Sequence, residues 1–575
     1  MDASVLPGAQ VQQTQKLPKM GFKRLSRDQW LMAFLLCSVI ILMTIGLVLP
    51  LLTMLIKSLY GTNGEFVGLA NYIQYLSTPS LSQSLSNTLT MGVVVTAVVG
   101  VVAFGYSFAL TRTCMPGKTV FKALGYLPIL TPSLLPGIAL VYLFGNQGVA
   151  KELLLGSSIY GPIGIVLGLV FWCFPHAMIL ISTGLSNSDA RLYEAAKVLR
   201  IPAWKTFFVV TLSNAKYGLI SALIVIFTLV VCDFGVAKVI GGQYNVLATD
   251  IYKQVVGMQN FSMGAVTSAV LLLPALVAFA IDRWVRKKQQ QMMSTSAVPY
   301  QPKPNKLRDG VAFAWCLLVA LSILTVIGMA VYGSLVTFWP YNTTLTLRHY
   351  DFENLTVYGW MPFYNSIKMA LLAAGIGTVF TFVIAYAVEK ANGMQRLRSL
   401  IHLIAMLPMA VPGLVLGLGY IFFFNDSSNP LNVLYGTMAI LVLNTIVHLY
   451  TVGHLTSLTA LKQLPAEIEA VAASLKISQF KAFWKVSVPV CLPAILDVFI
   501  YMFVNAMTTT SAVVFLYSTQ NIVASVAVMN MADTGAMASA AAMAIMIMLL
   551  AAGAKVLHLI ISHFLLKHTQ RWKTR

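Results

Sequence analysis

The residues best suited to bind a small charged solute lie at two matching places, each just after a long apolar stretch. In the first half they are a carboxylate and an amine, Asp233 and Lys238. In the second half they are three consecutive hydroxyls, Thr508, Thr509 and Thr510. Polar groups near membrane depth are costly unless they face a cavity or a partner, so these side chains could line a translocation path. The alternative is that they pair within a helix bundle or lie in the outer headgroup region.

Other reactive residue types lack the spacing that an enzyme or a metal site needs. Residues 114–119 contain a Gly-Lys-Thr fragment, but a phosphate-binding loop requires glycine where Arg112 stands. The six cysteines are scattered through or beside apolar segments without paired spacing, as is typical of buried thiols. His176, His402 and His448 are single histidines on apolar stretches. We therefore expect no catalytic site, no metal site and no cofactor bound by this chain.

The composition places these residues in a membrane protein. Of 575 residues, 58% are hydrophobic and 10% are charged, whereas a soluble domain has roughly a quarter charged. Apolar segments able to cross a core of ~30 Å, which takes ~20 residues each, form two sets of six. They begin near Leu31, Thr88, Leu124, Ile163, Tyr217 and Ala265, and near Val311, Ile367, Ile401, Met438, Cys491 and Ala538. The sequence predicts an all-α integral membrane protein with about twelve transmembrane helices in two parallel six-helix repeats.

The basic residues indicate the orientation. If both termini are cytoplasmic, the inner segments hold 31 of the 38 Lys and Arg residues. These segments are 1–30, 111–123, 184–216, 282–310, 389–400, 458–489 and 567–575. Such a bias is the positive-inside rule, and it predicts a bacterial inner membrane protein with both termini cytoplasmic. It also accounts for the net charge of +20 without a nucleic-acid partner; the expected surrounding is membrane lipid.

A polar stretch repeats between the fourth and fifth spans of each half. Residues 185–213 recur 276 positions later as residues 461–489. Leu199 then matches Leu475, Phe207 matches Phe483 and Val210 matches Val486. At the same offset, residues 131–137 match residues 407–413, and both carry prolines that should kink their spans. Two equivalent inner loops predict two equivalent docking sites.

Each loop predicts a short helix. In the first copy Ala195, Ala196 and Leu199 share one side at spacings of three and four, and Pro202 forces the helix to end. Alanines permit close approach of another protein. The alternative for a single copy is an amphipathic helix at the membrane interface, but its recurrence at one place in each repeat favours docking.

The Glu-Ala-Ala pattern followed by an aromatic-rich stretch resembles the cytoplasmic loop of permease subunits of binding-protein-dependent ABC importers. In that family the loop forms a coupling helix that seats in a groove of the ATPase subunit. The resemblance implies these coupling residues: Glu194, Ala195, Ala196, Leu199, Glu469, Ala470, Ala472 and Leu475. It implies a non-catalytic subunit served by an ABC ATPase homodimer, which holds ATP and Mg, and by a periplasmic solute-binding protein. The family's glycine is replaced by Arg200 and Lys476, and Ser213 stands where the second copy has Pro489.

A single chain of two fused permease domains resembles the branch of this family for iron(III), thiamine and 2-aminoethylphosphonate. Residues 233–255 and 507–518 are most similar to 2-aminoethylphosphonate permeases. The resemblance implies import of that solute, with iron(III) or thiamine as alternatives. It divides the chain into a cytoplasmic segment (1–30), a first permease domain (31–284), a cytoplasmic linker (285–310), a second permease domain (311–566) and a cytoplasmic tail (567–575).

Two other classes compete with an importer subunit. A twelve-span secondary transporter can also consist of two parallel halves, but it usually needs titratable groups within its spans to couple an ion gradient. The spans here are nearly free of acids. A non-transporting scaffold would leave the paired proline kinks unexplained.

Overall fold

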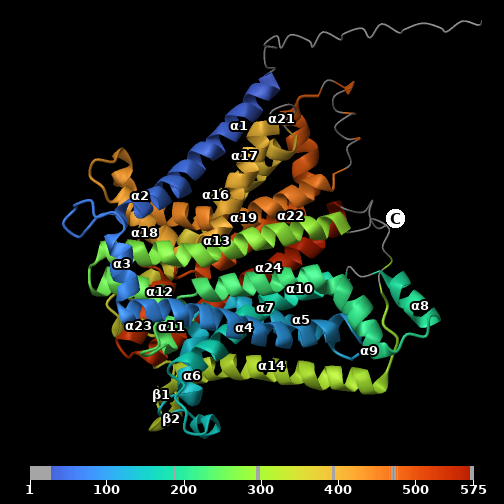
Figure 1. The fold of residues 1–575 in the computed structure, drawn as a ribbon, viewed down its shortest axis with the longest axis horizontal. Coiled ribbons are helices and arrows are strands. Elements are labelled where there is room, and N and C mark those ends of the chain that lie inside the picture. Colours follow the sequence, from blue (N-terminus) through green and yellow to red (C-terminus); the bar gives the residue numbers. More distant parts are fainter. Residues whose placement is uncertain are drawn as a thin grey trace, which may run out of the picture.

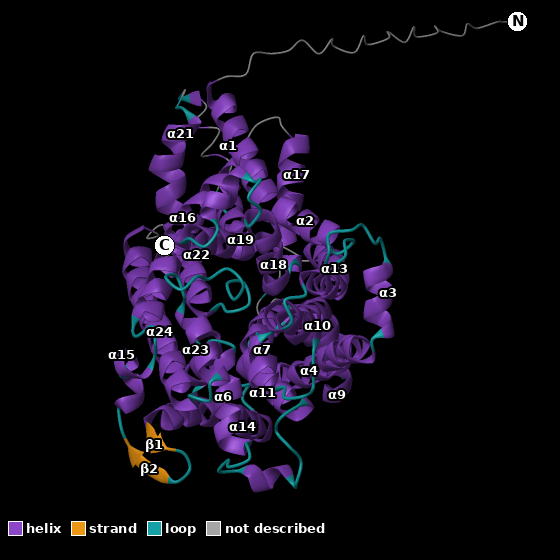
Figure 2. Ribbon diagram, turned by 90° about the vertical axis from the view of Figure 1, so that its left-hand side faces the viewer, coloured by secondary structure: helices purple, strands orange, loops and turns teal. Residues whose placement is uncertain are grey.

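The computed structural model describes residues 27–186, 189–292, 298, 300–390, 395–464, 467, 471, 474, 475 and 477–569. These residues form long helices that run side by side across the molecule (Figure 1). In Figure 2, which looks along the bundle from the end that carries α11 and α23, several of the helices are seen nearly end-on. The helices of the first half are α1 (Arg27–Met43), α2 (Leu49–Lys57), α3 (Ala70–Ser77), α4 (Pro79–Arg112), α5 (Lys118–Tyr126), α6 (Leu134–Phe144), α7 (Pro162–Ser186), α8 (Ala190–Val198), α9 (Ala203–Thr206), α10 (Ser213–Cys232), α11 (Gly235–Ile240), α12 (Leu247–Tyr252) and α13 (Phe261–Met292).

The second half follows the same plan. Its helices are α14 (Lys306–Leu335), α15 (Phe352–Leu355), α16 (Met361–Lys390), α17 (Gln395–Met406), α18 (Gly413–Phe424), α19 (Met438–Lys462), α21 (Gln479–Ala482), α22 (Val488–Thr508), α23 (Ala524–Asp533) and α24 (Met537–Thr569). One antiparallel hairpin, β1 (Val336–Phe338) with β2 (Asn342–Leu345), follows α14. The all-α prediction is confirmed for the part of the chain that the structure describes.

Ten of the described helices are long and apolar enough to cross a membrane, and two bent helix pairs raise the number to twelve. The bent pairs are 118–130 with 134–144, and 395–410 with 413–424, at angles of 103° and 108°. Both bends follow a 3-10 turn that starts Leu-Pro, and both are closed by one backbone hydrogen bond of 3.2 Å, to the carbonyl of Pro128 or Pro408. Because proline removes a backbone donor and blocks the helix before it, the third span of each half is broken.

Matching polar contacts demonstrate the repeat in three dimensions. Each half ties the end of its first span to a short helical segment that follows it, and the second span to the segment after the fifth. The pairs are Ser58 with Tyr72 and Ser334 with Tyr350 (Oγ to phenol oxygen, 2.7 and 2.8 Å), and Thr88 with Leu247 and Ser366 with Ala524 (Oγ to backbone N, 2.8 and 2.7 Å). Buried polar groups need such partners, so equivalent residues perform equivalent tasks in the two halves.

The broken spans align differently from the sequence match. The 3-10 turns Leu127–Leu130 and Leu407–Ala410 are 280 positions apart, and so are the last residues of α6 and α18, Phe144 and Phe424. The next helices, α7 and α19, begin 276 positions apart, at Pro162 and Met438. The expected match of residues 131–137 with 407–413 is therefore wrong by four positions: Leu127-Pro128 corresponds to Leu407-Pro408. The loop after the broken span absorbs the difference, since it is four residues longer in the first half.

The first helix of each half packs on the opposite half. Met32, Leu36, Val39 and Met43 of α1, spaced three and four apart, are buried in one cluster with residues of α16, such as Ala385. In the same way α14 packs on α4, α5 and α6, and Figure 1 shows α1 above the second-half helices and α14 below the first-half ones. The two halves are thus interlocked by an exchanged helix.

Candidate docking and translocation sites

Helix α8 forms within the first repeated loop, where the Glu-Ala-Ala pattern lies. Asp189 caps its start by accepting a hydrogen bond from Arg191 N at 3.0 Å, the usual role of a short acidic side chain at that position. At its end, Leu199 N donates to Ala195 O (2.9 Å). Arg200 then has φ +52°, a left-handed conformation that glycine adopts without steric cost. A glycine at this position would therefore adopt the same conformation without strain.

The exposed face of α8 differs from the predicted one. Glu194 and Ala195 are exposed, and Leu199 is 72% exposed. Ala196 is buried, so it packs the helix onto the protein and is not available to a partner. Val198, which the three-and-four spacing did not single out, is 81% exposed. Val198 and Leu199 are thus two neighbouring apolar side chains exposed at the end of α8.

The second loop is described only in part. Glu469, Ala470 and Ala472 lie outside the described residues. Leu475 is described and is 65% exposed, close to the exposure of its counterpart Leu199.

Aromatic residues in both loops anchor them to the bundle. Phe207 meets Phe104 and Phe108 of α4 edge to face, with ring centroids 6.0 and 5.9 Å apart. Phe483 meets the equivalent residues of α16, Phe382 and Tyr386, at 5.9 and 4.7 Å. Such pairs contribute about 0.5–1.5 kcal/mol each beyond burial. The predicted match of Phe207 with Phe483 is confirmed.

Both loops lie on the same face of the bundle. The first meets the carboxyl end of α4, and α14 begins beside that end, since Cys114 N donates to Asp309 Oδ1 at 3.1 Å. Helix α14 crosses the bundle and α16 returns, so the carboxyl end of α16 reaches the face where α14 began. There Tyr386 OH donates to Gln479 O of α21 at 3.2 Å. One partner assembly can therefore reach both loops.

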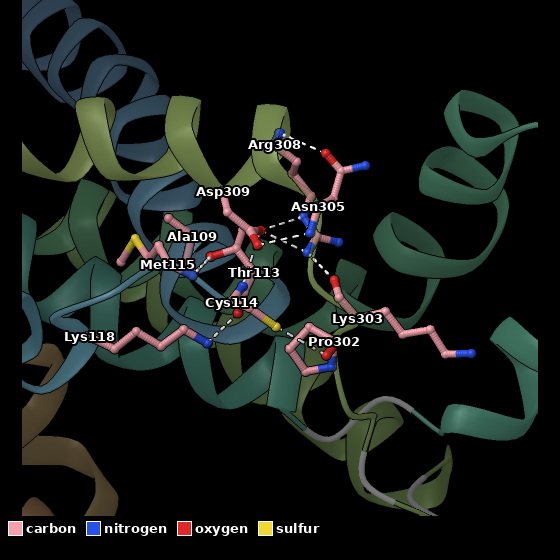
Figure 3. A network of polar contacts seen from close by, with 10 residues as sticks. All are labelled: Ala109, Thr113, Cys114, Met115, Lys118, Pro302, Lys303, Asn305, Arg308 and Asp309. Carbon is pink, nitrogen blue, oxygen red and sulfur yellow. Dashed lines mark hydrogen bonds and ion pairs between the residues drawn. The ribbon is translucent and has the colours of Figure 1, made fainter.

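The linker between the halves packs on the first loop. Ala190 N donates to Val298 O at 2.8 Å, and the Tyr193 and Tyr300 rings are 4.3 Å apart. The Arg112 guanidinium lies over both rings, 5.2 Å from Tyr193 and 4.7 Å from Tyr300. Further along, the linker is held by the contacts in Figure 3. There the Asp309 carboxylate accepts hydrogen bonds from Cys114 N and from the Arg308 side chain. The first loop is thus braced by a segment that occurs once in the chain.

At the other end of the bundle, Asp233 and Lys238 have different roles. Asp233 is buried at the end of α10, and its Oδ2 accepts a hydrogen bond from Val236 N at 3.1 Å. It therefore caps the turn into α11. Lys238 Nζ forms an ion pair with Asp533 Oδ1 of α23 at 3.0 Å and lies 4.8 Å from the centre of the Tyr252 ring. This ion pair joins the two halves.

The three threonines of the second half lie at the end of α22 and at the start of the turn that follows it. Thr508 Oγ1 donates to Val504 O within its own helix at 3.0 Å. Thr509 O accepts a hydrogen bond from Ser525 Oγ, and Thr510 is buried. Thr509 thus ties the end of α22 to α23.

Lys238 lines a cavity of about 220 Å³ that the sequence did not reveal. Its wall also contains Lys253, Asn245 and three tyrosines, Tyr160, Tyr244 and Tyr252. None of the described residues that line it is acidic. Burial raises the pKa of Tyr160 and Tyr244, and burial followed by the charge of Asp533 raises the pKa of Tyr252 to about 12. The phenols therefore stay protonated at neutral pH and can donate hydrogen bonds to an anion.

Comparisons with known proteins agree with this architecture. Residues 102–291 and 377–567 each match the family described as "Binding-protein-dependent transport system inner membrane component". The ferric transport system permease protein FbpB of Actinobacillus pleuropneumoniae is 27% identical over 89% of this chain and 75% of its own length. The Fe(3+)-transport system permease protein FbpB 2 of Haemophilus influenzae is 26% identical over 90% and 96%. The sulfate transport system permease protein CysT of Escherichia coli is 26% identical over 37% and 79%.

Proposed function

Because this chain belongs to the family of binding-protein-dependent transport system inner membrane components, being a fused two-domain ABC importer permease, we propose that its solute is 2-aminoethylphosphonate. The observation that carries this proposal is the cavity at Lys238, which offers two amines, three phenols and no lining carboxylate among the described residues. A phosphonate is recognised by such donors. A bare ferric ion would instead meet two positive charges.

A second candidate, iron(III), is favoured by a different observation. Relatives similar over 86–90% of this chain are named ferric or Fe(3+) transport permeases. The family match favours an ABC importer subunit over the two other classes considered above, an ion-coupled secondary transporter and a non-transporting scaffold.

The partner arrangement completes the proposal. An ABC ATPase homodimer, which holds ATP and Mg, docks on Glu194, Ala195, Leu199 and Val198 of the first loop and on the matching residues of the second, including Glu469, Ala470, Ala472 and Leu475. The common face of the two loops supports this arrangement. A periplasmic solute-binding protein delivers the solute to the opposite face. The chain itself is the non-catalytic transport subunit.

The orientation and domain limits are part of the same proposal. The basic residues on the face of the two loops support a cytoplasmic location for that face and for both termini. The permease domains are residues 31–284 and 311–566, with cytoplasmic segments 1–30, 285–310 and 567–575. The family matches at 102–291 and 377–567 fall almost entirely within these domains.

Two experiments test the proposal. For the solute, the purified permease is reconstituted in proteoliposomes with its ATPase and binding protein, and uptake of radiolabelled 2-aminoethylphosphonate and ferric ion is measured. We expect ATP-dependent uptake of 2-aminoethylphosphonate. Uptake of ferric ion alone would support the second candidate and refute the first.

For docking, the double variant Leu199→Asp, Leu475→Asp should lose co-purification of the ATPase, because each loop then presents a charge to an apolar contact. Leu155→Asp is the matched control, since Leu155 is 94% exposed in the loop between α6 and α7, outside both docking loops. Retention of the ATPase by the double variant would refute the docking site.

A further inference from the structure

The ion pair between Lys238 and Asp533 lies beside a cavity and between the two halves of the molecule. Lys238 comes from α11 of the first half and Asp533 from the end of α23 of the second. Figure 1 shows α11 and α23 together at the left-hand end of the bundle, away from α8 and α9. The stacking of Tyr252 on Phe515, with centroids 6.2 Å apart, is a second contact across the same boundary.

Segments of the cavity wall are hydrogen-bonded to one another and to α4. Asn245 O accepts a hydrogen bond from Asn87 Nδ2 at 2.9 Å, and Lys253 Nζ donates to Asn245 Oδ1. Gly161 N donates to Ile240 O at 2.9 Å, which ties the Tyr160 loop to α11. At about 220 Å³ the cavity is smaller than the ~300–1,000 Å³ of sites for drug-sized ligands. It therefore suits a solute of few atoms.

The cavity lies beside charges of both signs. Lys253 and Lys238 line it, and Asp533, which is not among its lining residues, forms the ion pair with Lys238. The Lys238 side chain is 23% exposed and that of Asp533 is 44% exposed. An ion pair in such a partly exposed place contributes little net free energy, about 0–1 kcal/mol. A solute that supplies better partners can therefore separate it.

We propose that the transported solute is a zwitterion that inserts into this ion pair. Its phosphonate takes the place of Asp533 at Lys238 and reaches Lys253 and the tyrosine hydroxyls, and its ammonium binds the released Asp533 carboxylate. The solute then bridges Lys238 of the first half and Asp533 of the second half. This bridge is lost when the solute leaves. Lys238, Lys253 and Asp533 are thus the specificity-determining residues, and Asp533 distinguishes an aminophosphonate from a phosphonate without an amine.

This inference rests on the proposed phosphonate import, and one set of assays separates the two. Uptake of 2-aminoethylphosphonate and of ethylphosphonate, which lacks the amine, is measured in the reconstituted complex described above. The variants are Asp533→Asn, Lys238→Gln and the control Lys151→Gln, which changes a lysine outside the cavity wall. Asp533→Asn should lower uptake of 2-aminoethylphosphonate relative to ethylphosphonate on the order of 10- to 100-fold, the equivalent of one hydrogen bond between charged groups.

Lys238→Gln should lower uptake of both compounds, and Lys151→Gln should change neither. An equal loss of both compounds in Asp533→Asn would mean that the ion pair only supports the fold, and would overturn the inference while phosphonate import stands. The exchanged pair Lys238→Asp with Asp533→Lys provides a second measurement. It restores an ion pair between the halves but moves the positive charge out of the cavity wall, so recovery of normal uptake by it would also overturn the inference. Absence of 2-aminoethylphosphonate uptake by the unaltered complex would overturn both the inference and the proposed function.

Discussion

Replacing Tyr300 by alanine should loosen helix α8, although Tyr300 lies in the linker and not in that helix. Tyr300 contributes one ring contact with Tyr193, 4.3 Å between centroids, and one face to Arg112, 4.7 Å from its ring. An aromatic pair is worth about 0.5–1.5 kcal/mol and a cation–π contact at a site of this kind about 0.5–1 kcal/mol. The variant should therefore lose about 1–2.5 kcal/mol of local stability. At about 1.4 kcal/mol per factor of ten, opening of α8 becomes on the order of 5- to 60-fold more frequent.

Hydrogen–deuterium exchange of the full-length permease in nanodiscs measures this opening. The amides of residues 193–201, which are hydrogen-bonded within and just after α8, should exchange faster in the variant by that factor. Amides of residues 483–487 in the second half are the internal control, because the linker contacts found here are with the first loop. Trp204→Ala is the matched control variant, since Trp204 is an exposed aromatic residue close to α8. Unchanged exchange at residues 193–201 in Tyr300→Ala, or equal acceleration in both halves, would refute the bracing role of the linker.

Three further pairs of substitutions have calculable effects. Arg200→Gly should slow exchange of α8 and Arg200→Val should accelerate it, because a left-handed conformation costs a branched residue about 1–2 kcal/mol or more; the same rate in both variants would contradict the φ of +52°. Phe483→Ala should lower the free energy of unfolding by about 3–5 kcal/mol, because the side chain is buried, whereas Trp484→Ala, at an exposed position, should change it by less than about 1 kcal/mol; thermal unfolding in detergent measures both. Gly218→Val should destabilise the protein by about 1–3 kcal/mol, because a side-chain carbon there would stand 2.9 Å from the backbone of α7. Gly375→Val is the control and should be tolerated, because a side-chain carbon there would meet no atom within 4 Å. Equal yields and unfolding temperatures of the two variants would contradict the close approach of the helices.

Local properties of the sequence determined the class, the spans and the repeat. A span needs about twenty apolar residues because the lipid core offers no partner for the backbone, so each span satisfies its own hydrogen bonds and is visible in its own stretch of sequence. The loop helix was predictable for the same reason: Asp189 and Pro202, which delimit α8, act on residues next to them. The equivalence of Phe207 and Phe483 in the two repeats followed from the offset of 276 alone.

The tertiary structure decided what depends on residues far apart in the chain. The partner of Lys238 is Asp533, in the opposite half, and the cavity beside that ion pair is assembled from α11, α12 and the loop at Tyr160. Periodicity describes which side of a helix is apolar but does not say which helix covers it, so the exchange of α1 and α14 between the halves was invisible in the sequence. The same limit applies to Ala196, whose burial depends on what α8 packs against, and to Tyr300, which reaches Tyr193 only because the linker folds back.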